Sequence, residues 1–126
     1  MSAGAQSRGS SEMARTLAPK SVTSPIAIEL SARIGGISQL TGGIVIATGI
    51  LGAMFGPEFL RRCGIKSRMA IGLAVGTASH GIGVARLESE DAGRDDLSQA
   101  MGIIAMTLNA LATALLLPVL LRILGI

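Results

Sequence analysis

The sequence contains few of the residue types on which soluble enzymes depend. Only 15% of its 126 residues are charged and 2% are aromatic, whereas charged residues make up about a quarter of a typical soluble domain. Trp and Tyr are absent, so Arg and Lys are left to anchor the ends of membrane segments. The apolar content comes from Ala, Ile, Leu, Val and Met, interleaved with 17 glycines. This composition is typical of an integral membrane protein whose partner is the lipid bilayer.

Several kinds of site are excluded by what is missing. Cys63 is the only cysteine and His80 the only histidine, so there is no intramolecular disulfide and no cluster with metal-ligand spacing. The glycines at 81 and 83 lack the third glycine of a dinucleotide-binding fingerprint. The net charge of +3 is spread over segment flanks, which argues against nucleic acid as a partner. We therefore expect no enzyme activity, no cofactor and no metal.

Long stretches without ionisable side chains predict membrane spans. Twenty helical residues cover about 30 Å, the thickness of a hydrocarbon core, so residues 34–57 and 97–121 are long enough to cross. Residues 69–85 are barely long enough, and Gly, Thr, Ser and His replace Leu and Ile in their second half, which indicates a short or interrupted helix. Residues 17–33 contain Pro25, which disfavours helix just before it, so we predict a broken or re-entrant element there.

The predicted organisation is a polar, flexible tail at residues 1–16 and a membrane domain at residues 17–126. The connector 58–68 carries four basic residues and one acidic residue, and the positive-inside rule places it in the cytoplasm. Residues 86–96 carry five acidic and two basic residues and are expected on the opposite side. The sequence thus predicts an all-α integral membrane protein with three to four transmembrane helices, two of them broken or re-entrant.

The densest polar run at membrane depth is GTASHGIG, residues 76–83. Irregular backbone inside a bilayer must be buried in protein or line a cavity, because unpaired N–H and C=O groups are costly in hydrocarbon. Freed N–H groups, the hydroxyls of Thr77 and Ser79 and a half-helix N-terminus would suit a small carboxylate. His80 would bind the anion or take up a coupling proton. The alternative is a neutral histidine hydrogen-bonded between packed helices.

A second polar run lies between two prolines and contains Lys20, Ser21, Thr23 and Ser24. Lys20 would meet a substrate carboxylate; the alternative is a lysine that extends to the membrane interface beside a helix-capping serine.

Other polar and small residues of the predicted spans are interpreted as structural. Glu29 and Arg33 have the i,i+4 spacing of an ion pair on one helix face. Asn109, alone in the last span, is expected to make an interhelical hydrogen bond. Glycine pairs four residues apart, at 52 and 56 and at 72 and 76, predict close helix packing.

The stretches PKSVTSPIA (19–27) and GTASHGIGVAR (76–86) carry a family resemblance. In order and spacing they resemble the two signature stretches of the LrgB/CidB family, and the resemblance covers about residues 17–121. It implies a multi-pass protein of the bacterial inner membrane. The substrate-binding residues that we expect on this basis are Lys20, Ser21, Thr23, Ser24, Thr77, Ser79, His80, Gly81 and Arg86.

Members of that family are described as antiholin-like or as modulators of murein hydrolase export, and related plant plastid proteins move glycolate and glycerate. The resemblance implies a transporter subunit for small carboxylates of the pyruvate, glycolate or glycerate type, with a small LrgA/CidA-like membrane protein as partner. The alternatives are a non-transporting antiholin-like regulator of murein hydrolase export and autolysis, or an inactive truncated fragment. Family members are nearly twice as long, so we expect a homo-oligomer, or a missing N-terminal half, to complete the site.

Overall fold

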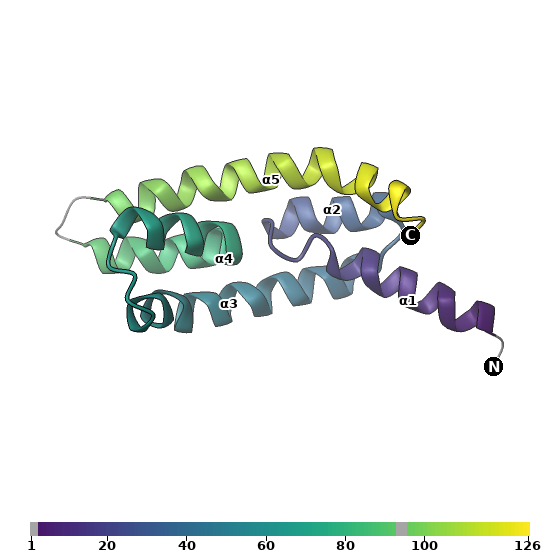
Figure 1. Cartoon of the computed structure of the whole chain (residues 1–126), viewed down its shortest axis with the longest axis horizontal. Helices are drawn as coiled ribbons and strands as arrows, with labels where there is room; N and C mark the ends of the chain where they lie inside the picture. The colour runs from purple at the N-terminus through teal and green to yellow at the C-terminus, as the bar shows by residue number, and fades with distance from the viewer. Residues whose placement is uncertain (1–2, 93–95) are drawn as a thin grey trace.

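The computed structural model describes residues 3–92 and 96–126, and all regular structure in that part of the chain is helical (Figure 1). The helices are α1 (Ala3–Leu17), α2 (Ser24–Ile34), α3 (Ser38–Arg62), α4 (Arg68–Asp91) and α5 (Leu97–Ile123). The all-α prediction is confirmed. The predicted break before Pro25 is also present, because α2 begins only at Ser24 and the proline lies in its first turn, where the missing N–H costs no helical hydrogen bond.

Helix α1 occupies the stretch in which the sequence predicts a flexible polar tail. Ala and Arg, which favour helix, recur along it. Its C-terminal turn packs against the start of α3: Thr16 is buried, its Oγ1 accepts a hydrogen bond from the Ile37 N–H at 2.9 Å, and its carbonyl accepts one from the Thr41 hydroxyl at 2.9 Å. The rest of α1 projects beyond the N-terminal end of α3 (Figure 1). The expected boundary at residue 16 therefore falls inside a packed helix end.

Helix α4 reverses direction at His80, where φ is 42° and ψ is −141°. Residues 23 apart in a continuous helix would be separated by about 34 Å. Instead, the Arg68 guanidinium donates to the Asp91 carboxylate at 2.5 Å, although these residues are 23 positions apart. Helix α4 is therefore a hairpin, whose arms 68–79 and 81–91 run side by side from a common base to a tip at His80 (Figure 1).

The interruption predicted within residues 76–83 is confirmed, but one consequence drawn from the sequence is wrong. The sequence places residues 86–96, of which 93–95 lie outside the described residues, across the membrane from the connector 58–68. In the structure the second arm returns to the connector's side, where Glu90 pairs with Arg61 and Asp91 pairs with Arg68. The break lets the helix fold back, and the carboxylates then meet arginines of opposite charge. The second arm and the connector therefore lie at the same end of the molecule.

The two long helices, α3 and α5, flank the shorter elements (Figure 1). The α4 hairpin packs at one end of them and α2 at the other, with the tip of the hairpin and the start of α2 directed toward the middle. Each end has its own small apolar cluster. Val22, Ala27, Val45 and Ala110 form the one beside α2; Ile71, Val75 and Leu87, with Leu60 packed against them, form the one inside the hairpin.

Glycines let the hairpin pack against the backbone of both long helices. A Cβ atom at Gly76 would overlap the backbone of Gly102 in α5, and one at Gly52 in α3 would overlap the Ser79 side chain. Because lipid tails are as apolar as leucine, helices in a membrane associate through such close packing rather than through burial of apolar surface. The structural interpretation of these glycines is confirmed.

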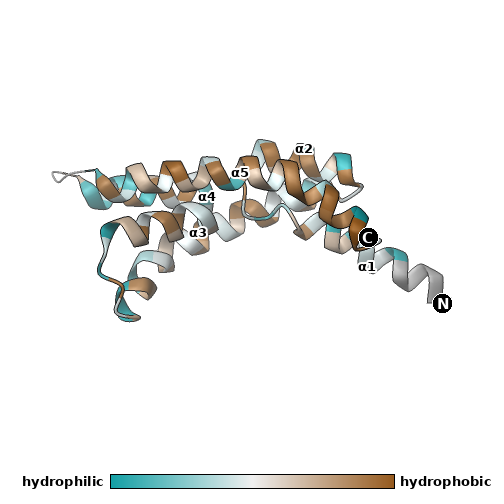
Figure 2. Ribbon diagram, turned by 45° about the horizontal axis from the view of Figure 1, so that its top comes forward, coloured by the Kyte–Doolittle hydropathy of each residue, from teal (hydrophilic) through white to brown (hydrophobic). Residues whose placement is uncertain are grey.

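Helices α3 and α5 are rich in apolar residues (Figure 2), and many of their large apolar side chains are exposed. Both are long and apolar enough to cross a membrane, and only 17% and 11% of their most apolar windows are buried inside the protein. A core helix of a soluble protein would be mostly buried instead. Hydrophilic residues lie at the base of the hairpin and on the α3–α4 connector at one end of the molecule, and on α1 and α2 at the other (Figure 2).

Candidate functional site

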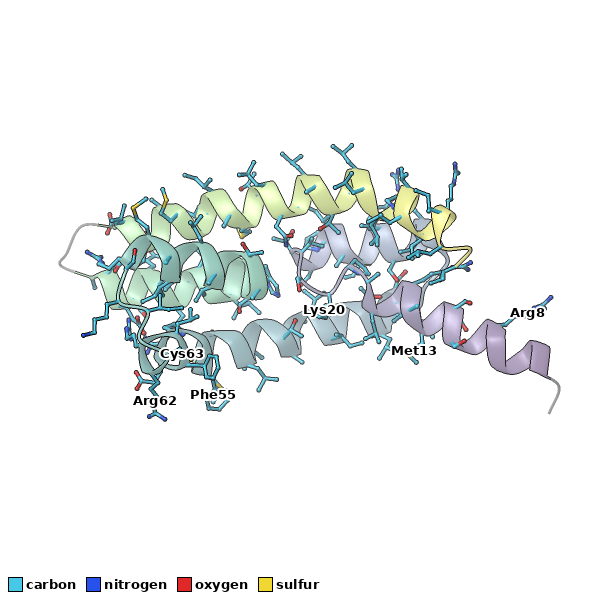
Figure 3. The ribbon with its side chains drawn as sticks, viewed as in Figure 1. Arg8, Met13, Lys20, Phe55, Arg62 and Cys63 are labelled. Atoms are coloured by element: carbon cyan, nitrogen blue, oxygen red, sulfur yellow. The ribbon has the colours of Figure 1, made fainter. Side chains whose placement is uncertain are left out.

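The first interrupted segment, residues 18–23, brings a lysine to the middle of the molecule. Figure 3 shows Lys20 beside α3, about halfway along the long axis. The Lys20 side chain is exposed and its Nζ donates to the Ser21 hydroxyl at 2.9 Å. Its carbonyl lies 3.2 Å from the hydroxyl of Thr48 in α3. The segment ends at Thr23, the N-cap of α2, whose side chain makes no capping hydrogen bond. Ser24 follows as the first helical residue and is half-buried.

The second interrupted segment is the tip of the α4 hairpin. His80 is only 3% exposed, and its Nε2 lies 2.9 Å from the Val45 carbonyl of α3. Because a carbonyl only accepts, this contact assigns the proton to Nε2. Ser79 is buried against Gly52, and Gly81, on the other side of the histidine, is half-buried near Met106 of α5. The alternative interpretation of His80, a histidine hydrogen-bonded between packed helices, thus describes its contact here.

Asn109 of α5 joins the two interrupted segments. Its Nδ2 donates to the Ser21 carbonyl at 2.9 Å and to the Thr77 carbonyl at 3.3 Å. Both neighbours are acceptors, which fixes the orientation of the amide. The predicted interhelical hydrogen bond is confirmed, but sequence reasoning missed that one side chain would contact both breaks. The available signal was that Asn109 is the one amide deep within the most apolar predicted span.

Two of the expected site residues, Arg86 and Thr77, do not direct their side chains to this junction. Arg86 is exposed and pairs with Glu90 at 3.0 Å, on the second arm of the hairpin. The Thr77 hydroxyl donates to the Leu73 carbonyl at 2.7 Å within its own helix, so only the Thr77 carbonyl reaches the junction. The structure therefore brings together Lys20 and Ser21 with the backbone of the hairpin tip, through α3 and α5.

A separate polar cluster closes the base of the hairpin. Asp91 is buried and accepts hydrogen bonds from Arg68, from the Ser98 hydroxyl and from the Gln99 N–H. Burial raises the pKa of Asp91, but the hydrogen bonds from Ser98, Arg68 and Gln99, together with the guanidinium charge, outweigh burial and hold the pKa below its ordinary value. This cluster fastens the start of α5 to both arms of α4.

We expect Asp91→Asn to lower the free energy of unfolding at pH 7 by about 2 kcal/mol, because charge-assisted hydrogen bonds are lost. Since folding lowers the pKa of Asp91, its stabilisation is complete above about pH 4, the ordinary aspartate range, and is lost as the pH falls through the lowered value. Thermal unfolding in detergent, followed by circular dichroism from pH 7 to pH 3, should show wild type and variant converging at the acidic end. Glu58→Gln, in an exposed ion pair with Arg62, is the control and should change little.

Comparison with known proteins gives the family. The model of the LrgB-like family matches residues 3–123. The chain is 39% identical to the holin-like protein CidB of Staphylococcus epidermidis over 105 residues, which are 83% of this chain and 44% of the relative. It is 46% identical over 72 residues to an uncharacterized protein of Haemophilus influenzae, covering 57% of this chain and 31% of that one. The chain spans less than half the length of these curated relatives, and no solved structure matches it. With its two apolar helices, it is a bacterial membrane protein that belongs to the LrgB-like family.

Proposed function

We propose that the protein is a subunit of a transporter for small carboxylates, passing more than once through the bacterial inner membrane. The observation that carries the proposal is the meeting of two interrupted segments, residues 18–23 and the α4 tip, between the apolar helices α3 and α5. Secondary transporters commonly bind substrate where discontinuous helices meet near the middle of the bilayer. In this arrangement α3 and α5 cross the membrane, and the α4 hairpin enters and leaves on one side.

The two segments carry complementary groups for a small carboxylate. Helix α2 starts without a side-chain cap, so the N–H groups of its first turn, apart from Pro25, which has none, and the positive end of its dipole are available to an anion. Lys20 adds a positive charge, and the hydroxyls of Ser21, Thr23 and Ser24 would orient the substrate. Across the junction, Ser79 and Gly81 would shape the opposite wall, with His80 as the group that exchanges a proton.

The candidate function is tested by uptake into proteoliposomes. Labelled pyruvate, glycolate and glycerate would be offered to the purified full chain, alone and with a small LrgA/CidA-like membrane protein. We expect uptake of at least one of them, and a loss of about tenfold or more in Lys20→Met, because a charge-assisted contact contributes roughly 1.5–3 kcal/mol. Arg62→Gln removes the same charge at an exposed position far along α3 and should retain uptake.

A second candidate function is a non-transporting, holin-like regulator of murein hydrolase export and autolysis. The name of the Staphylococcus epidermidis relative, holin-like protein CidB, favours it. A regulator that acts by assembling with copies of itself or with a partner would depend on the glycine faces and not on Lys20. Full-strength control of autolysis by Lys20→Met, combined with no uptake by the folded wild type under either condition, would establish the regulator and exclude the transporter.

A further inference from the structure

A polar cavity of about 150 Å³ lies at the base of the α4 hairpin. Its lining comes from the end of α3, the connector, both arms of α4 and the start of α5: Arg61, Lys66, Arg68, Ile71, Glu90, Asp91 and Ser98. Ser98 and the junction residue Asn109 are eleven positions apart on α5, or about 16 Å along a helix. The cavity is therefore separate from the proposed transport site.

The lining has more positive than negative charge, and its carboxylates are already satisfied. Glu90 accepts from Arg61 and from Arg86 outside the cavity, and Asp91 accepts from Arg68. Arg61 uses only Nη2 for its ion pair. Lys66 is exposed and makes no ion pair or hydrogen bond with any described residue. The Lys66 ammonium group and the remaining guanidinium N–H donors of Arg61 thus face a cavity whose carboxylates are already paired. An anion would accept hydrogen bonds from these donors.

The surroundings indicate what kind of anion fits. The cavity lies where α3 ends and α5 begins, which is the interface with water if these two helices cross the membrane. Large apolar side chains next to its lining residues are exposed: Ile65 lies in the connector, Met69 follows it, and Leu97 precedes Ser98. A molecule that has a phosphate group at the interface and apolar chains along the helices matches both features. Basic pockets between membrane helices bind anionic headgroups in this way.

We propose that this cavity binds the phosphate headgroup of an anionic phospholipid, with the acyl chains lying along the exposed apolar residues beside it. Lys66 and Arg61 contact the phosphate. Bound lipid then links the connector to the hairpin base, so that the lipid composition of the membrane sets how firmly the hairpin is held.

The test is thermal unfolding of the full chain in neutral detergent at fixed ionic strength, followed by circular dichroism since the chain has no Trp or Tyr. Phosphatidylglycerol, phosphatidylcholine and inorganic phosphate are added separately. We expect phosphatidylglycerol to raise the midpoint by about 5 °C at saturation, with phosphatidylcholine and inorganic phosphate giving less than half of that rise. Native mass spectrometry should show phosphatidylglycerol retained on the protein.

Lys66→Gln should lose most of the rise, whereas Arg62→Gln, with the same change in net charge on a neighbouring residue outside the cavity, should keep it. The proposal is overturned if Lys66→Gln responds as wild type does or if phosphatidylcholine is equally effective. Full stabilisation by millimolar inorganic phosphate would also overturn it, by making the ligand a free anion. None of these outcomes depends on transport activity.

Discussion

Gly76→Val is expected to lower the free energy of unfolding by about 3 kcal/mol, because the new side chain would have to push the α4 hairpin away from α5. A Cβ atom at Gly76 would meet the backbone of Gly102, and backbone cannot rotate aside as the end of a side chain can. The hairpin also contacts α3 through Gly52, so a displaced hairpin loses both interfaces. Thermal unfolding in detergent, with size-exclusion profiles at each temperature, measures the effect.

Gly43→Val supplies the matched control in the same class of substitution. Gly43 lies on α3, and apart from its neighbours and the backbone of its own helix no atom lies within 4 Å of the position a Cβ would take. Valine has a somewhat higher helix propensity than glycine, so the control should be neutral or slightly stabilised. Equal stability of the two variants would show that the close approach of α4 and α5 is absent in the membrane-extracted protein.

The membrane topology can be tested by cysteine labelling, and each cysteine should react almost entirely from one side of the membrane. Cys63, the only cysteine, is exposed at the end of α3, so a membrane-impermeant maleimide should label it from one side only. In a Cys63→Ala background, Glu88→Cys on the second arm of α4 should be labelled from that same side, because the arms share a base. Gln39→Cys, at the opposite end of α3, should be labelled from the other side.

Sealed vesicles of both orientations distinguish the hairpin from a crossing helix. If Glu88→Cys and Gln39→Cys are labelled from the same side, residues 69–85 cross the membrane, as the sequence alone predicts. The hairpin would then have to open in the bilayer. Equal labelling from both sides, in vesicles shown to be sealed, would likewise contradict a fixed hairpin.

The two breaks could be predicted from local composition, but the path of the chain after the second break could not. Glycines and small polar residues around residue 80 mark where a helix can be interrupted. Whether the chain then continues or turns back depends on contacts between residues far apart in sequence, here Arg61 with Glu90 and Arg68 with Asp91. The positive-inside rule counts the lysines and arginines of each loop and does not consider ion pairs between loops.

The backbone conformation of His80, the residue at the tip of the hairpin, could not be predicted from the sequence either. Glycine is the residue that adopts positive φ most readily, yet His80 is the one described non-glycine residue with positive φ. Such a conformation is disfavoured for an L-residue and persists only where surroundings hold it. Here the Val45 carbonyl holds the ring, and Gly49, which has no side chain, leaves room for it.

The sequence predicts the candidate site as two polar runs, and Lys20 and Ser21 do lie at the junction with the hairpin tip. The family resemblance places Arg86 among the site residues, but its guanidinium pairs with Glu90, four residues later on the same helix. For Asn109 the sequence predicts an interhelical hydrogen bond without naming its partner, because an isolated polar residue in a span has no sequence context. Only the folded chain reveals which two carbonyls it contacts.

That amide has a mechanical consequence. Both of its N–H hydrogens are committed, one to a carbonyl before α2 and one to a carbonyl near the tip of α4. If α5 slides by a single helical turn, about 5.4 Å, both bonds break in the same step, and neither segment can keep its partner while the other loses it. The two halves of the junction are thereby made to release together.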